Sequence, residues 1–143
     1  MNLFTIGFTR KSASQFFGLL QAAGVRRLVD IRLNNTSQMA GFSKRDDLAY
    51  FTRQILGIDY LHETRLAPSQ EILDDFRLNG DWARYESGFL ALLDQRRVAG
   101  LLDRALFDDA CLLCSEPTAG QCHRRLAAEF LAKAWGGASI RHL

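Results

Sequence analysis

Short apolar runs alternate with amphipathic segments along the chain. The apolar runs predict strands at residues 2–6, 27–31, 58–62, 110–114 and 138–143. Between them, apolar side chains recur three or four positions apart, which is the spacing of an amphipathic helix. Strands that alternate with helices predict an α/β fold, and we expect a single three-layer domain with a largely parallel sheet flanked by helices.

Capping residues mark several ends of the predicted helices. Ser12 and Gln15 fit a capping box, in which each side chain satisfies an otherwise unpaired backbone N–H, and Gly24 is a natural end for that helix. Ser43 predicts the start of another helix, which ends at Gly57. Further helical segments are predicted near residues 70–78, 82–97, 98–107 and 121–135.

Composition and charge narrow the class of protein. A chain of 143 residues most often forms one domain, here residues 1–143, and the net charge of +2 does not demand a polyanionic partner. No apolar stretch approaches the roughly 18 residues of a membrane span, and the N-terminal segment lacks the pattern of a secretory signal. The three cysteines, Cys111, Cys114 and Cys122, are therefore expected to be reduced thiols in a cytoplasmic protein.

Three loops are the predicted location of a site. Ligands of open parallel sheets bind beyond the carboxyl ends of the strands, and each of these loops also precedes a helix N-terminus, which favours an anion. The polar residues concerned are Thr9, Arg10, Lys11 and Ser12 on the first loop, Arg32, Asn34, Asn35 and Ser37 on the second, and Cys114, Ser115, Glu116 and Thr118 on the third. The arginines on these loops have two possible roles: they form an anion site, or they are surface residues paired with acidic neighbours. The sequence does not decide between these roles.

Asp30 and Arg32 lie at the end of the second predicted strand. Because strand side chains alternate, both point to the same side of the sheet, where a charge must be paired. We expect Asp30 to cap backbone N–H groups and to orient Arg32. Arg32, one step beyond the strand, is the better candidate for contact with a ligand.

The stretch LLCSEPTAGQCHRRL (residues 112–126) carries the candidate chemistry. A zinc site is not expected, because Cys111 and Cys114 lie three apart in a strand and point to opposite faces. Cys114 ends that strand beside basic residues, which makes it the candidate nucleophile and leaves a small buried core residue as its alternative role. His123 and Glu116 are the candidate proton-transfer groups.

For the remaining residues of this stretch we expect mainly structural roles. Cys122 precedes Leu126 by one helical turn and is expected to pack in the core. His123, at a helix N-terminus, is expected to be a neutral imidazole. Arg124 is positioned to reach over the loop, and Arg125 and Glu129 form a predicted ion pair on the solvent side.

The sequence resembles one family along most of its length. The segments that carry the resemblance are TIGFTRKS, LVDIRLNN, AGFSKRDDL, WARYESGF, LLCSE and CHRRL. They resemble the domain-of-unknown-function-488 family, and the matching motif positions are Gly7, Ser12, Asp30, Arg32, Cys114, Glu116, Cys122, His123 and Arg124. The resemblance implies a compact cytoplasmic α/β domain without an established activity. A weaker similarity to rhodanese domains lacks the loop that cradles the rhodanese cysteine.

The functional hypothesis is a binding site for an anionic, phosphate-bearing ligand. Arg32, Arg124 and the backbone of residues 7–12 would hold the anion, with Cys114 as a reactive thiol; no cofactor is indicated by the sequence. The alternative is a nucleic-acid-binding module without catalysis. Its basic edge would comprise Arg10, Lys11, Lys44, Arg45, Arg124 and Arg125, with Phe8 and Phe42 available to stack on bases.

Overall fold

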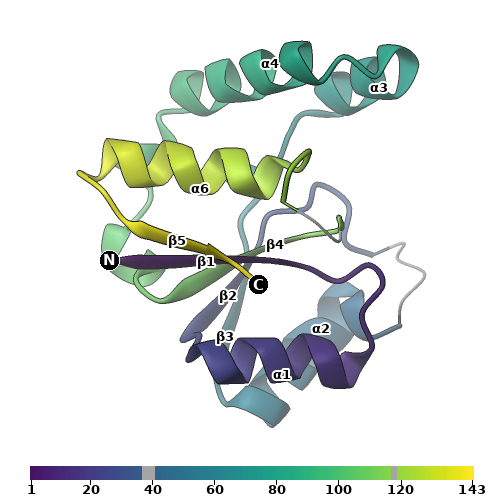
Figure 1. The fold of residues 1–143 in the computed structure, drawn as a ribbon, viewed down its shortest axis with the longest axis vertical. Helices are drawn as coiled ribbons and strands as arrows, with labels where there is room; N and C mark the ends of the chain where they lie inside the picture. Colours follow the sequence, from purple (N-terminus) through teal and green to yellow (C-terminus); the bar gives the residue numbers. More distant parts are fainter. Residues whose placement is uncertain (37–40, 117–118) are drawn as a thin grey trace.

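The computed structural model describes residues 1–36, 41–116 and 119–143 (Figure 1). Ser37 and Thr118, which belong to the predicted loops, lie outside the described residues. The strands are β1 (Asn2–Gly7), β2 (Arg27–Asp30), β3 (Asp59–His62), β4 (Ala110–Cys114) and β5 (Ser139–His142). The α-helices are α1 (Ala13–Ala23), α2 (Arg45–Phe51), α3 (Gln70–Asn79), α4 (Trp82–Gln95), α5 (Val98–Leu101) and α6 (His123–Ala134). The predicted α/β class is confirmed.

The five strands form one sheet in the order β3-β2-β4-β1-β5, and every pairing is parallel. Parallel neighbours require a crossover connection, and helices supply these crossovers. The central strands β4 and β1 are buried almost throughout, which explains why their sequences are continuous apolar runs rather than alternating ones.

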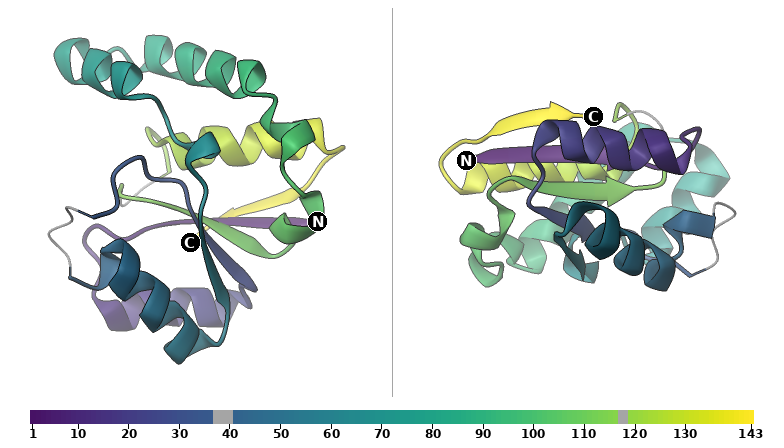
Figure 2. Two further views of the ribbon diagram at one scale, coloured as in Figure 1. Left: turned by 180° about the vertical axis from the view of Figure 1, so that it is seen from behind. Right: turned by 90° about the horizontal axis from the view of Figure 1, so that it is seen from below.

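Helices cover both faces of the sheet. α1 and α2 lie together on one face, whereas α6 lies on the other, with α4 packed on α6 and α3 beside α4 (Figures 1 and 2). The alternation along β4 divides the core accordingly: Cys111 and Leu113 pack with Phe16 on the α1 side, and Leu112 packs with Leu126 on the α6 side.

Three predicted helix boundaries are wrong. Ser43 is buried in a short 3-10 turn and does not cap a helix, because the helix begins at Arg45 without a side-chain cap. The segment predicted at 98–107 divides into α5 and a 3-10 turn at Arg104–Phe107. The last helix begins later than predicted, and Cys122 is its N-cap rather than a residue of its interior.

The connections create a crevice at one end of the sheet. β1 and β2 lead into helices on one face, whereas their neighbour β4 leads into α6 on the opposite face. Where adjacent strands diverge in this way, the loops at their carboxyl ends separate and leave room for a ligand. None of the described helices is long and apolar enough to cross a membrane, and the longest of them, α4, has 14 residues.

Candidate functional site

A pocket of about 550 Å³ lies beyond the carboxyl ends of β2 and β4. One side is formed by the segments that follow these strands and by the start of α6, and the other side is formed by α3 and α4. Side chains that line it include Arg32, Phe76, Trp82, Tyr85, Cys114 and His123. The volume falls within the range of small-molecule sites in proteins.

Aromatic side chains form the wall contributed by α3 and α4. The rings of Trp82 and Tyr85 stack with centroids 4.9 Å apart, and Phe76 meets Tyr85 edge-on at 5.2 Å. Burial raises the pKa of the Tyr85 phenol, with the charge of Glu116 adding to the effect, so this ring stays neutral. Helical spacing puts Trp82 and Tyr85 on one face of α4, but spacing alone does not indicate that this face borders a pocket.

Asp30 fixes the guanidinium of Arg32 as predicted. Asp30 is fully buried, and its carboxylate accepts bonds from Nε of Arg32 at 2.8 Å and from Nη2 at 2.7 Å. Asn35 and Tyr60 also donate to this carboxylate. Burial opposes ionisation of Asp30, but the hydrogen bonds and charge of Arg32 outweigh it and lower the pKa of the carboxyl.

The third guanidinium nitrogen of Arg32 is not satisfied. The Arg32 side chain is 3% exposed and lies over the ring of Phe8, 5.1 Å from its centroid. Its Nη1 is buried and has no hydrogen-bond partner within the described part of the chain. Buried donors are nearly always paired, so Nη1 marks a position where an external acceptor would be stabilised.

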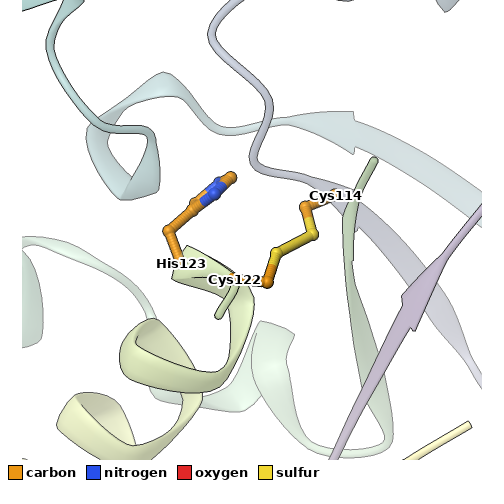
Figure 3. A group of neighbouring side chains, drawn as sticks. All are labelled: Cys114, Cys122 and His123. Carbon is orange, nitrogen blue, oxygen red and sulfur yellow. A yellow bond between two sulfur atoms is a disulfide. The ribbon is translucent and has the colours of Figure 1, made fainter. Parts of the chain in front are cut away.

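Cys114 and Cys122 are joined in a disulfide beside the pocket (Figure 3). The disulfide contradicts the expectation of reduced thiols for these two residues. Cys122 is buried as expected, at 3% exposure, and it also borders the pocket. Cys122 is the N-cap residue of α6, and this position lies against Cys114 at the end of β4. The spacing of the two cysteines in the sequence does not predict this contact.

Cys111 behaves as predicted. It is a free, buried thiol on the α1 side of the sheet, opposite to Cys114, and burial raises its pKa. The two cysteines therefore cannot converge on one metal ion. A different trio is close together, because the ligand atoms of Cys114, Cys122 and His123 lie within 4.8 Å of one another. This trio could hold a thiophilic metal only after reduction of the disulfide.

His123 begins α6 and is held by the neighbouring strand. Its Nε2 donates to the backbone carbonyl of Ile31 at 2.7 Å, and its ring meets Phe89 edge-on at 5.6 Å. Because a carbonyl only accepts, Nε2 carries the proton and Nδ1 is an acceptor. Burial lowers the pKa of His123 to about 4, with the charge of Arg124 contributing, so the imidazole is neutral at pH 7.

Arg124 is a buried charge beside the disulfide. It is 1% exposed, and its guanidinium donates to Sγ of Cys114 at 3.3 Å, to the hydroxyl of Thr5 at 3.2 Å and to the backbone carbonyl of Glu116. Within the described residues it forms no ion pair, since all three acceptors are uncharged. Desolvation accordingly lowers the pKa of Arg124.

Gly7 makes this arrangement possible. A Cβ atom at this position would lie 1.6 Å from the carbonyl oxygen of Glu116 and 2.6 Å from Nη1 of Arg124. Only a glycine therefore allows the end of β1 to approach the loop that holds the guanidinium.

The predicted loops converge in part. Arg32 and Glu116 border the pocket, and Arg124 lies behind Cys114. The first loop contributes no side chain to the pocket lining. Thr9 bonds to the backbone carbonyl of Ser115 through its N–H and its hydroxyl, which ties the first loop to the third.

The other residues predicted on the first loop have different positions. Ser12 and Gln15 form the predicted capping box of α1. Arg10 adopts a left-handed backbone conformation with φ of 62° and borders a separate, shallow pocket beside α1. The sequence could not separate these positions, because all three loops end strands of the same parallel sheet.

Among the residues predicted for nucleic-acid binding, Arg10, Lys44 and Arg45 are exposed, whereas one arginine and both aromatic rings are packed within the protein. Arg124 is buried, and Phe8 is 6% exposed and packs in the core. Phe42 packs partly buried against Phe16 and Phe17 with ring centroids 5.4 and 6.1 Å away. The two aromatic rings proposed to stack on bases are thus occupied by contacts within the protein.

Comparison with known proteins places the chain in a family. No curated protein and no solved structure matches it. A family model does match residues 12–131, a range that includes α1, the Asp30–Arg32 pair, the disulfide and the first turns of α6. Because this match covers most of the sequence, the chain belongs to the family described as Domain of unknown function DUF488.

Proposed function

We propose that the protein binds a small anionic, phosphate-bearing molecule in the pocket beyond β2 and β4. The observation that carries this proposal is the buried, unpartnered Nη1 of Arg32. Asp30 holds the other side of the guanidinium rigidly, so the free donor is preorganised and little entropy is lost when an anion binds.

The N-terminus of α6 adds a second source of positive potential. This helix has 12 residues, and its N-cap, Cys122, makes no side-chain hydrogen bond to the first turn. Uncapped N–H groups and the helix dipole favour an anion near the residues that border the pocket.

The aromatic wall favours a ligand that also carries a flat ring. Trp82 is only partly buried and borders the pocket, whereas Tyr85 is 6% exposed and already stacks on Trp82 and Phe89. The ring of Trp82 is therefore the one we propose for contact with a ligand. An aromatic face stacks on planar groups, and stacking of this kind contributes about 1–3 kcal/mol for a nucleic-acid base. The chemical class that combines both features is a mononucleotide or a similar ring-bearing phosphate.

Calorimetric titration with inorganic phosphate and with mononucleotides tests this function. The variant Arg32→Lys keeps a charge for Asp30 but removes Nη1, and we expect at least tenfold weaker binding, since a hydrogen bond to a charged group contributes about 1.5–3 kcal/mol. Arg10→Lys is the matched control, because Arg10 borders a different pocket, and its affinity should stay within twofold of the wild type.

The same titrations separate the ligand-binding reading from the nucleic-acid alternative. Binding of mononucleotides that changes little between low and high salt supports a preorganised pocket. Binding of oligonucleotides alone, with an affinity that falls steeply with salt, would overturn it. Equal affinities of Arg32→Lys and the wild type would also contradict the proposal.

A further inference from the structure

Two cysteines lie at the pocket, and binding of an anion does not require them. Cys114 and Cys122 are bonded to each other, both border the pocket, and they are 1% and 3% exposed. A small molecule inside the pocket is therefore placed to reach sulfur atoms that are otherwise shielded. This position differs from that of Cys111, which is buried on the far side of the sheet.

We propose that Cys114 and Cys122 form a reversible redox pair that exchanges with low-molecular-weight thiols entering the pocket. The net reaction converts the protein disulfide and two small thiols into a protein dithiol and one small disulfide. Two electrons pass from the small thiols to the protein pair, and their two protons go to solvent or to the cysteines. The proposal goes beyond phosphate binding and does not depend on it.

The surroundings of the two sulfur atoms assign their roles. Nη1 of Arg124 donates to Sγ of Cys114 at 3.3 Å, and among the described residues the acceptors of this guanidinium are all uncharged. A thiolate at Cys114 would supply the missing negative charge. Because a stabilised thiolate leaves fastest in disulfide exchange, Cys114 is the leaving group and Cys122 is the sulfur attacked.

The exchange then proceeds in two displacements. The thiolate of the first small thiol attacks Sγ of Cys122, the protein disulfide breaks, and Cys114 leaves as a thiolate beside Arg124. This step produces a mixed disulfide on Cys122. A second small thiol attacks the outer sulfur of that mixed disulfide, the small disulfide departs, and the Cys122 thiolate remains at the N-terminus of α6, where the helix dipole stabilises it.

A redox titration tests the pair directly. The protein is equilibrated with mixtures of reduced and oxidised glutathione, quenched with an alkylating reagent and weighed by mass spectrometry. Two thiols, those of Cys114 and Cys122, should appear and disappear together. Cys111→Ser is the matched control and should leave the transition in place, whereas Cys114→Ser and Cys122→Ser should each abolish it.

Two results, one from this titration and one from elemental analysis of the purified protein, would overturn the proposal. One is a protein that never forms the Cys114–Cys122 bond in oxidised glutathione. The other is about one zinc per chain in the purified protein, lost on mutation of Cys114, because the thiolates would then serve as metal ligands. Phosphate binding measured on Cys114→Ser distinguishes this failure from failure of the proposed ligand site.

The roles of the individual sulfurs have their own readout. Oxidised glutathione should accumulate as an adduct on Cys122 in the Cys114→Ser variant. In Cys122→Ser, the alkylation rate of Cys114 should rise with an inflection well below pH 8.5, the ordinary value of a thiol. Arg124→Lys in that background should keep a low inflection and Arg124→Gln should raise it. If neither Arg124 variant folds, an inflection at or above pH 8.5 in Cys122→Ser alone still refutes stabilisation of the Cys114 thiolate by Arg124.

Discussion

Replacing Asp30 with asparagine removes the charge at the centre of the buried polar network. The carboxylate accepts two hydrogen bonds from the Arg32 guanidinium and one from its backbone N–H, at 2.8, 2.7 and 3.2 Å. Asn35 donates at 3.2 Å, and Tyr60 donates as well. An asparagine amide has one acceptor oxygen in place of two and turns an NH₂ group toward these donors, while the Arg32 charge stays buried.

The expected loss of stability is large for a single atom exchange. Breaking a buried ion pair by removing one partner typically costs about 3–5 kcal/mol, because the remaining charge is left without compensation. A typical domain has a total unfolding free energy of about 5–15 kcal/mol, so Asp30→Asn removes a substantial part of it. With a urea dependence of about 2 kcal/mol per molar, the unfolding midpoint should fall by roughly 2 M.

Urea unfolding followed by circular dichroism and tryptophan fluorescence measures this loss. Asp59→Asn is the matched control, because Asp59 lies on the neighbouring strand β3 with a side chain 65% exposed and meets Arg27 at 3.6 Å. Its midpoint should match that of the wild type within error. A fall of less than about 0.5 M for Asp30→Asn would refute the view that this network stabilises the fold.

Acid should remove the stabilisation that the ionised Asp30 carboxylate contributes. The pKa of Asp30 is lower in the folded protein than its ordinary 3.8, so the unfolded chain binds the proton first as the pH falls. The stabilisation is therefore fully present above pH 3.8 and is lost as the pH drops through the lower folded value. The difference between wild type and Asp30→Asn should shrink in that range and be constant near neutrality.

Two further variants separate structural roles from roles in the site. Ser12→Ala should lower the unfolding free energy by about 1 kcal/mol through loss of the α1 cap, with phosphate affinity unchanged, and a loss of phosphate binding would contradict this. His123 has its pKa lowered from 6.5 to about 4, so its contribution to stability should be complete above pH 6.5 and decline toward pH 4. His123→Gln should make the midpoint temperature of thermal unfolding depend less on pH between 4 and 6.5. An unchanged pH dependence would refute the assignment of this effect to His123.

Much of the fold is contained in the local pattern of the sequence. The predicted strand runs agree with the observed strands to within about one residue at each end, and the capping box at Ser12 and the stop at Gly24 are present as predicted. These features are local, because caps and periodicity depend on residues within one or two turns of each other. The strand order, with β4 inserted between β2 and β1, depends on long-range packing and left no local trace.

The candidate site was predicted less completely. The loops of Arg32 and Cys114 were found, because the ends of parallel strands gather at one edge of a sheet. The wall formed by Phe76, Trp82 and Tyr85 was missed, since helical spacing gives a face but not what the face borders. The disulfide was missed for a related reason: the return of Cys122 onto the end of β4 is a tertiary contact between residues separated by a turn.

The balance of buried charge links the two proposals. Arg32 and Arg124 are 3% and 1% exposed, and Asp30, which pairs with Arg32, is the one buried carboxylate among the described residues. This region therefore carries an excess of buried positive charge, which an anion in the pocket would offset. A Cys114 thiolate, formed when the disulfide is reduced, would offset it as well.

Two negative groups that satisfy the same positive region should compete. Reduction of the Cys114–Cys122 disulfide is accordingly expected to weaken phosphate binding several-fold, because the new thiolate beside Arg124 repels the anion. Linkage requires the reciprocal effect, so saturating phosphate should shift the glutathione titration toward the disulfide by the same factor. Calorimetry on oxidised protein and on protein reduced with dithiothreitol measures the first effect, and Cys111→Ser serves as the control. Equal phosphate affinities in the two redox states would show that the disulfide and the anion do not share one electrostatic field.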